Sequence, residues 1–152
     1  MLKEGDQAPN FTLKNEQNQD ITLGDFKGKK VVLYFYPKDN TPGCTKEACS
    51  FRDVYDDILA AEAIVIGVSK DDASSHQRFK DKHKLPFYLL SNPDHSVIES
   101  YGAWQEKKMF GKTSMGIVRS TFIINENRII IKTYEKVKPD EHGEEVLKIL
   151  RG

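Results

Sequence analysis

Two unbroken runs of β-branched and aromatic residues constrain the fold of this chain more than any other feature. They are VVLYFY at Val31 to Tyr36 and AIVIGV at Ala63 to Val68. Runs of this kind are typical of strands that are covered on both faces, as in parallel sheets. The segment between them has apolar residues at helical spacing, which predicts a helix from about Pro42 to Glu62. A strand, a helix and a second strand in this order predict an α/β sheet.

The rest of the chain continues the alternation of strands and helices. A small hairpin is predicted near the start, and a loop that is rich in Gly and Lys precedes the last strands. The expected elements are a hairpin within Phe11 to Leu23, a helix from Ser69–Asp72 to Lys84, a strand at Phe87 to Leu90, a helix at Ser96 to Tyr101, a loop through Met115, a strand pair at Thr121 to Ile124 and Arg128 to Tyr134, and a helix at Asp140 to Leu150. We therefore predict one domain over residues 1–152, with a mixed sheet that is largely parallel and has an antiparallel edge.

Charge and hydropathy argue against nucleic-acid binding proteins, membrane-spanning proteins and secreted proteins. The chain has 23 basic and 23 acidic residues, whereas nucleic-acid binding proteins usually carry a basic excess. The short basic clusters at Lys27 to Lys30 and at Lys107-Lys108 are interpreted as solvated loops. No window approaches the ~18 apolar residues of a membrane-spanning helix. The start, Met1 to Asn10, lacks the apolar segment of a secretory signal, so we expect a cytoplasmic protein.

Metal sites and disulfide scaffolds are also disfavoured. Two cysteines cannot complete a zinc site alone, and the four histidines are too scattered to show metal-ligand spacing. We expect all four at the surface; they are His76, His83, His95 and His142. The remaining candidates for chemistry are the two thiols, Cys44 and Cys49, which lie five residues apart.

Cys44 follows the first buried strand, at the carboxyl end where α/β sheets place their functional sites. Thr41 is a good N-cap residue and Pro42 suits the first helical position, so Cys44 falls in the first turn of the predicted helix. A helix start of this kind lowers the pKa of a cysteine thiol from about 8.5 toward ~7 or below. The alternative is that Cys44 is a small buried apolar residue.

Helical geometry limits how the two thiols can interact. In an intact helix their Cα atoms would be roughly 8.6 Å apart, and a disulfide requires about 7 Å or less. The first turns would have to unwind, which a start containing Gly43 makes easier. Cys49 is then either a thiol that resolves an oxidised Cys44 or an unrelated exposed thiol.

Several motifs together resemble a known family. Pro37-x-x-x-Thr41-x-x-Cys44 resembles the active-site signature of peroxiredoxins, which are thiol peroxidases with a thioredoxin-like fold. The sequence TPGCTKEAC, ending at Cys49, is similar to the peroxiredoxin Q (bacterioferritin comigratory protein) subfamily. The likeness continues through most of the chain, in GDQAPNF from Gly5, IGVS from Ile66, LPFYLLS from Leu85, YGAW from Tyr101 and RSTFII from Arg119.

The resemblance implies a role for each of five residues. Cys44 matches the peroxidatic cysteine that attacks the O–O bond, and Cys49 matches the resolving cysteine. Thr41 matches the residue whose hydroxyl bonds the thiolate or the peroxide, a role that competes with helix capping. Arg119 matches the arginine that stabilises the thiolate and the departing oxygen, and Pro37 matches the proline that shields the sulfur.

The resemblance also implies substrates and partners. A hydroperoxide is the substrate, thioredoxin or a similar dithiol regenerates the thiols, and the protein is a monomer without haem, flavin or metal. Two positions stand apart from the motif residues. Asn92 replaces an Asp that is common in similar sequences, and Glu47 either pairs with Arg119 or simply lies on the helix face. The competing functions are a thiol–disulfide oxidoreductase, which typically has Cys-x-x-Cys spacing, and a non-enzymatic redox sensor.

Overall fold

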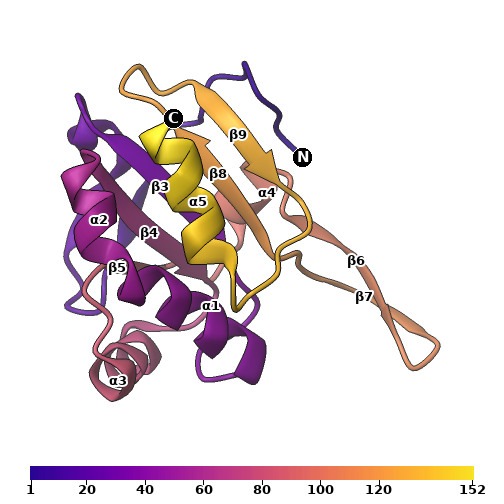
Figure 1. Ribbon diagram of the computed structural model, residues 1–152. Coiled ribbons are helices and arrows are strands. Elements are labelled where there is room, and N and C mark those ends of the chain that lie inside the picture. Colours follow the sequence, from indigo (N-terminus) through magenta and orange to yellow (C-terminus); the bar gives the residue numbers. More distant parts are fainter.

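The computed structural model describes residues 1–152 and contains a seven-stranded sheet with helices on both faces (Figure 1). The strands are β1 (Thr12–Lys14), β2 (Asp20–Thr22), β3 (Lys30–Phe35), β4 (Ala63–Ser69), β5 (Tyr88–Ser91), β8 (Ser120–Ile124) and β9 (Ile130–Tyr134). Their order in the sheet is β2-β1-β5-β4-β3-β8-β9. The three central strands β3, β4 and β5 are parallel, and antiparallel strands flank them on both sides. The predicted mixed α/β sheet is therefore confirmed.

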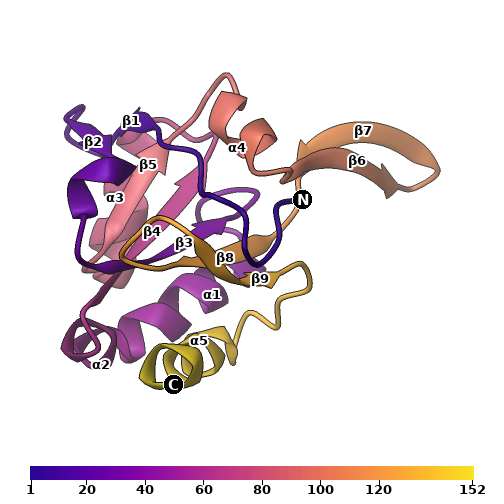
Figure 2. The same ribbon diagram turned by 90° about the horizontal axis from the view of Figure 1, so that it is seen from above.

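Helices cover the two faces of this sheet and create two separate cores. They are the 3₁₀ turn η1 (Leu23–Phe26) and the helices α1 (Pro42–Asp53), α2 (Tyr55–Ala60), α3 (Ala73–His83), α4 (Ser96–Ser100) and α5 (His142–Arg151). In β3, Val32 and Tyr34 pack with α1, α2, α3 and α5, whereas Leu33 and Phe35 pack with η1 and α4. Figure 2 shows α1 and α5 on one side of the sheet and α4 on the other. The continuous apolar run of β3 is explained by burial on both faces.

Residues that are distant in the sequence meet at the end of the sheet where the parallel strands finish. The carboxyl ends of β4 and β5 lie together there, since the Asn92 N–H donates to the Ser69 carbonyl at 2.8 Å. Strand β8 runs antiparallel to β3 and starts at the same edge, with Phe35 opposite Ser120. Arg119 directly precedes β8, so the register between β8 and β3 brings Arg119 to the loop that follows β3.

The long helix that the sequence predicts is broken in the structure. Helix α1 ends at Asp53, and α2 starts after Val54, whose φ is −115°. The Val54 N–H donates to the carbonyls of Phe51 and Arg52, as in a tightened final turn. Val54 is β-branched and nearly buried in the core, and such residues fit helices less well. The break reorients the chain before β4.

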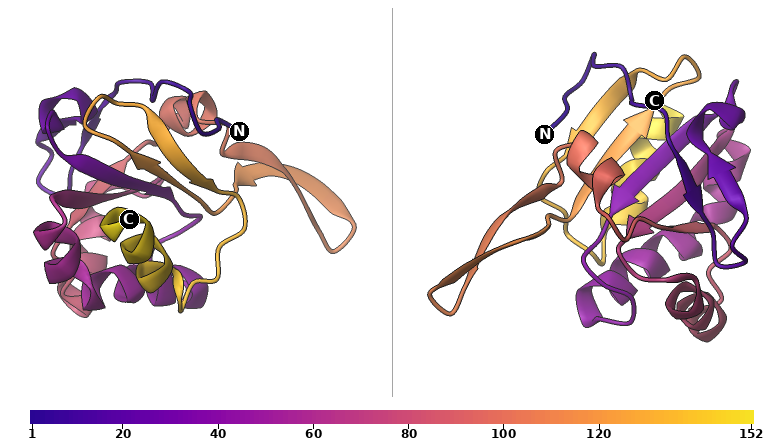
Figure 3. Two further views of the ribbon diagram at one scale, coloured as in Figure 1. Left: turned by 45° about the horizontal axis from the view of Figure 1, so that its top comes forward. Right: turned by 180° about the vertical axis from the view of Figure 1, so that it is seen from behind.

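The loop that was expected to run through Met115 is instead a hairpin. Strand β6 (Trp104–Met109) pairs antiparallel with β7 (Lys112–Ile117), and this ribbon projects from the body (Figures 1 and 3). Phe110 and Gly111 join the strands, both with positive φ, as a two-residue type I′ turn requires. Most side chains of the ribbon are exposed, so it lacks the apolar alternation by which a strand is recognised. The interpretation of Lys107-Lys108 as a loop was wrong for this reason.

Candidate active site

Cys44 lies in the first turn of α1, three residues after the N-cap Thr41. The first helical bond joins the Thr45 N–H to the Thr41 carbonyl at 2.9 Å. The earlier N–H groups of a helix have no partner within it, and they carry a partial positive charge that favours an anion. The Cys44 side chain is only 1% exposed. The predicted helix start and the place of Cys44 in it are thus confirmed.

Arg119 lies between the Cys44 sulfur and a buried carboxylate. Its Nη2 donates to Cys44 Sγ at 3.4 Å, and its Nη1 donates to Glu47 Oε1 at 2.7 Å. Partial burial disfavours the charge of the guanidinium, but Glu47 and Cys44 together raise the pKa of Arg119. A permanent cation therefore faces the sulfur. The fold brings together two residues that are 75 positions apart.

Gly43 allows this close approach. A Cβ atom built on Gly43 would lie 3.0 Å from Arg119 Nη2, which is tighter than ordinary van der Waals contact. Any side chain at this position would push the guanidinium away from the helix start. The glycine before Cys44 is thus explained by the position of Arg119.

Glu47 pairs with Arg119, which decides between the two roles that the sequence left open. Its side chain is fully buried, and this burial raises its pKa to about 7 although Arg119 acts in the opposite direction. The Oε2 atom has no hydrogen-bond partner. The bond from Arg119 therefore compensates the loss of water at only one of the two carboxylate oxygens of Glu47. Glu47 orients Arg119 and is near its own titration point at neutral pH.

The Thr41 hydroxyl does not cap the helix. It donates to the Lys38 carbonyl oxygen at 2.8 Å, and no side-chain capping bond forms at this N-terminus. With its proton held by Lys38, the hydroxyl oxygen has lone pairs left to accept a hydrogen bond. Pro37 is half-buried in the same loop, directly after Tyr36 at the end of β3.

Cys49 lies farther along the same helix as Cys44. Both thiols are free, and Cys49 is partly exposed. Helix α1 is continuous from Pro42 to Asp53, so the two sulfurs cannot bond while the helix is intact. The structure thus corresponds to the reduced state with α1 fully wound.

Two of the four histidines are buried, so the prediction that all lie at the surface was wrong for His76 and His142. His142 Nε2 lies 2.7 Å from Thr121 Oγ1, and His76 Nδ1 lies 2.7 Å from Asp39 Oδ2. Sequence patterns missed these pairs because their members come from separate elements. Asp39 and His76 are 37 residues apart and belong to no motif with fixed spacing.

Surface cavities do not mark this site, since Cys44 lines none of the four that the molecule has. The largest has a volume of about 580 Å³ and lies between Lys27-Gly28 and the turn at Glu126 to Arg128. The candidate site is instead defined by the contact of Arg119 with Cys44 and Glu47.

Comparisons with known proteins identify the family of this chain. The model of the AhpC/TSA family matches residues 4–133. The chain is 51% identical over 146 residues to a putative peroxiredoxin Bcp of Coxiella burnetii, covering 96% of this chain and 97% of that protein. It is 48% identical over 150 residues to peroxiredoxin Bcp of Bacillus subtilis, covering 99% and 96%.

Solved structures give the same result. Peroxiredoxin Q of Xylella fastidiosa superposes with a TM-score of 0.93 at 35% identity, covering 99% of this chain and 96% of that one. A structure of the bacterioferritin comigratory protein of Xanthomonas campestris, described in terms of alkyl peroxide reduction, has a TM-score of 0.88 at 35% identity and covers 93% and 90%. The thioredoxin-like fold expected from the sequence is confirmed.

Proposed function

This chain belongs to the AhpC/TSA family, as a peroxiredoxin of the Bcp or Q type, and from that premise we propose how its residues reduce hydroperoxides. The protein is a thiol-dependent peroxidase that acts on hydroperoxides with a thiol reductant. The assignment of steps to residues that follows is supported chiefly by one observation, the guanidinium of Arg119 between Cys44 and Glu47.

In the first step, Cys44 attacks the peroxide as a thiolate. The sulfur bonds to the terminal oxygen of ROOH, the O–O bond breaks, and RO⁻ leaves and takes a proton from water. The products are the sulfenic acid of Cys44 and water or an alcohol. Arg119 stabilises the thiolate and then the negative charge that develops on the departing oxygen, in a site that is largely screened from water.

Thr41 orients the substrate. Because its hydroxyl donates to the Lys38 carbonyl, its oxygen is free to accept the O–H of the peroxide. That hydrogen bond would direct the terminal oxygen toward Cys44. Pro37 completes the loop and limits the access of water to the sulfur.

In the second step, the Cys49 thiol attacks the sulfenic sulfur of Cys44, an S–S bond forms and water leaves. Helix α1 must unwind between the two residues for this to happen. A dithiol such as thioredoxin then reduces the disulfide by exchange.

The setting of the enzyme is also part of the proposal. No helix in the structure has the length and apolar composition that crossing a bilayer would require. We propose that the enzyme is a monomer, because an intrachain disulfide needs no second subunit. We also propose that it acts in the cytoplasm, where thiol reductants keep cysteines reduced.

Replacement of each cysteine tests this scheme. Cys44→Ser should abolish peroxide reduction, because the attacking atom is lost. Cys49→Ser should consume one equivalent of peroxide and then stall with thioredoxin as the reductant. The measurement is NADPH oxidation coupled through thioredoxin and its reductase, with the mass of the protein recorded after one turnover.

The same assay separates the competing functions. A thiol–disulfide oxidoreductase would oxidise NADPH with a disulfide substrate and without peroxide. A redox sensor would not turn over at micromolar peroxide. Full thioredoxin-coupled activity in Cys49→Ser would show that Cys49 is not the resolving residue.

A further inference from the structure

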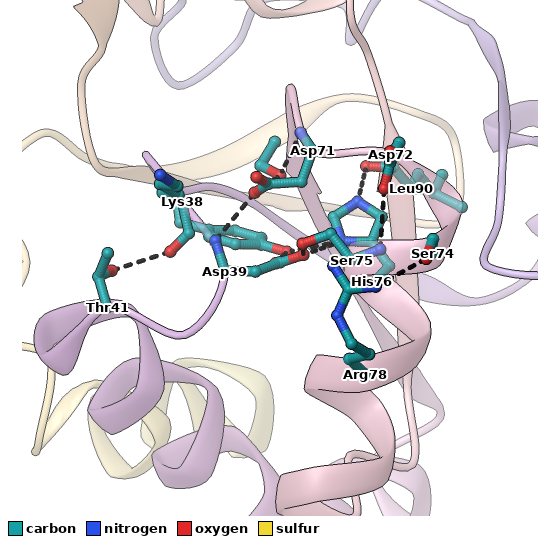
Figure 4. Close-up of polar contacts among 12 residues, drawn as sticks. Lys38, Asp39, Thr41, Asp71, Asp72, Ser74, Ser75, His76, Arg78 and Leu90 are labelled. Atoms are coloured by element: carbon teal, nitrogen blue, oxygen red, sulfur yellow. Dashed lines mark hydrogen bonds and ion pairs between the residues drawn. The ribbon is translucent and has the colours of Figure 1, made fainter.

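A buried polar network joins the loop before Cys44 to helix α3, and the proposed mechanism makes no use of it. Its central residues are Asp39, which is 5% exposed, and His76, which is fully buried. Asp39 belongs to the loop between β3 and α1, whereas His76 lies in the first half of α3. Figure 4 shows their side chains meeting in the gap between the loop and the helix.

The contacts of His76 determine where its protons lie. His76 Nε2 is 3.0 Å from the carbonyl oxygen of Leu90, and a carbonyl can only accept, so Nε2 carries a hydrogen. His76 Nδ1 is 2.7 Å from Asp39 Oδ2, and one further proton lies between these two atoms. An imidazolium that faces a carboxylate would satisfy this geometry, and so would a neutral imidazole that faces a carboxylic acid.

The other partners of Asp39 favour the ion pair. The Tyr36 hydroxyl lies 2.6 Å from Asp39 Oδ1 and the Ser75 hydroxyl lies 2.8 Å from Asp39 Oδ2. Two O–H donors stabilise a carboxylate. The Asp39 backbone N–H also donates to Asp71 Oδ2 at 2.8 Å, which places a second acidic group beside the imidazole. The loop is thus held to α3 by a buried, charge-assisted hydrogen bond.

A metal ion at this place is less consistent with the distances. Asp39, Asp71 and His76 offer three ligand atoms within 4.8 Å of one another. Two ligands on one zinc ion would be roughly 3.4 Å apart, given metal–ligand bonds of about 2.1 Å and tetrahedral angles. The 2.7 Å between His76 Nδ1 and Asp39 Oδ2 is instead typical of a charge-assisted hydrogen bond.

The network is connected to the active site through the backbone of Lys38 and Asn40, the two neighbours of Asp39 in the loop. Lys38 precedes Asp39 and supplies the carbonyl that accepts from the Thr41 hydroxyl. Asn40 lies between Asp39 and Thr41 with a φ of 61°, a left-handed conformation that Asn adopts more readily than most residues other than glycine. The anchored Asp39 side chain holds this turn in place.

We propose that Asp39 and His76 are positioning residues for peroxide reduction, which fix the loop so that the Thr41 hydroxyl faces the substrate. This inference rests on the proposed role of Thr41. Neither residue touches the peroxide or the sulfur. Loss of the anchor would let the turn relax, and displacements of about 1 Å near reacting atoms can slow a reaction roughly a hundredfold.

Two isosteric variants of His76 separate positioning from a purely structural role. In His76→Asn the amide nitrogen takes the place of Nδ1 and keeps the bond to Asp39. In His76→Gln it takes the place of Nε2 and keeps the bond to Leu90. Both variants are neutral, so they are matched in charge. We expect His76→Asn to react with hydrogen peroxide at nearly the wild-type rate, and His76→Gln to be about ten- to a hundredfold slower.

The measurement is the second-order rate constant of the reduced protein with hydrogen peroxide, well below the unfolding temperature of each variant. The rate at which dithiol reduces the disulfide should be the same in both. In a Thr41→Val background, His76→Gln should cause little further loss, because the group that it positions is absent. If the His76 variants do not fold, Asp39→Asn, which can still bond His76, is compared with Asp39→Ala in the same way.

Each outcome has a distinct meaning. The positioning role would be overturned if His76→Asn and His76→Gln reacted at equal rates. Where the Asp39 variants replace them, equal rates for Asp39→Asn and Asp39→Ala would have the same meaning. The role would also be overturned if the losses caused by His76→Gln and Thr41→Val were additive. If Thr41→Val is as fast as wild type, the proposed function of Thr41 fails and this inference fails with it. Calorimetry with zinc chloride tests for a metal site. Stoichiometric binding by wild type but not by His76→Ala would show that these residues bind a metal ion and would overturn the interpretation as an anchor.

Discussion

At the scale of single residues, the site depends on one cation shared between two acids. Arg119 donates to Cys44 through one nitrogen and to Glu47 through the other. The positive charge would be drawn toward whichever acid is ionised. Burial makes the charge on Glu47 costly, and its pKa of about 7 means that a change of pH near neutrality alters how much of the field of Arg119 acts on the sulfur.

The titration of Glu47 has a predictable effect on stability. Its pKa is raised from 4.5 to about 7, so between these values the folded state binds more protons than the unfolded state. The contribution of Glu47 to the free energy of unfolding therefore decreases as the pH rises through this window. In Glu47→Gln that decrease is absent.

We accordingly expect the free energy of unfolding of Glu47→Gln, relative to wild type, to rise by roughly 2 kcal/mol between pH 5 and pH 8. Urea denaturation at the two pH values measures this difference. Glu106→Gln, which changes an exposed carboxyl, is the control. A difference between Glu47→Gln and wild type that is the same at both pH values would contradict the assignment.

At the scale of elements, the two halves of α1 are held by different contacts, the first by Arg119 through Cys44 and Glu47 and the second by α5. The start of α5 packs tightly against α1, since a Cβ on Gly143 would lie 2.1 Å from the Ser50 carbonyl oxygen. The Gly143 N–H also donates to Ser50 Oγ at 3.0 Å. Residues from Ser50 onward are therefore held by α5, whereas the turns that contain Cys44 and Cys49 precede this contact. Unwinding is expected to stop at Ser50.

Hydrogen exchange can detect this boundary. After oxidation by one equivalent of peroxide, the amides from Thr45 to Asp53 should lose protection, because each donates to a carbonyl four residues earlier, at or before Cys49. The amides of Val54 and Ile58, which donate to the carbonyls of Phe51 and Val54, should keep it. Exchange measured by NMR or mass spectrometry gives the comparison, and Cys49→Ser, which forms no intrachain disulfide, should keep protection throughout. Loss of protection at Val54 and Ile58 as well would place the boundary elsewhere.

The packing of α5 against α1 can be tested separately. Gly143→Ala would place a methyl group against the Ser50 carbonyl, so the free energy of unfolding should fall by about 1–3 kcal/mol. Gly116→Ala is the matched control, since its Cβ would meet only the flexible side chain of Lys107, at 3.2 Å. Equal stability of the two variants in urea denaturation would show that the close packing of Gly143 against Ser50 does not contribute to the free energy of unfolding.

At the scale of the whole molecule, the functional residues converge on one edge of a sheet that is buried on both faces. The parallel strands β3 and β4 end there, and the antiparallel β8 begins there. The β6–β7 ribbon lies outside both cores, and Phe110 at its tip is 97% exposed. The proposed chemistry needs only groups of one chain, since Cys44, Cys49 and Arg119 all belong to it.

A monomeric mechanism predicts the mass of the protein in both redox states. Sedimentation should give 17.4 kDa for the reduced protein and the same value after oxidation by peroxide. Gel electrophoresis without reductant should show no dimer, because the disulfide joins Cys44 to Cys49 of one chain. A covalent dimer after oxidation would contradict the intrachain disulfide.

Local patterns were sufficient to predict much of this protein. The apolar runs at Val31 to Tyr36 and Ala63 to Val68 predicted two buried strands of a largely parallel sheet, and β3 and β4 are parallel neighbours in the structure. The Thr41-Pro42 start placed Cys44 in the first turn of α1. These features depend on residues that are close in the sequence, where periodicity and the preference of Pro for the first helical position decide the conformation.

By itself, therefore, the sequence determined the central strands, the helix that carries the thiols and the spacing that requires α1 to unwind. Only the tertiary structure decided that Arg119 touches Cys44, that Glu47 is buried beneath it and that His76 holds Asp39. These contacts join residues from 37 to 75 positions apart. They depend on strand register and on burial between elements, and no local pattern of side chains encodes either of these.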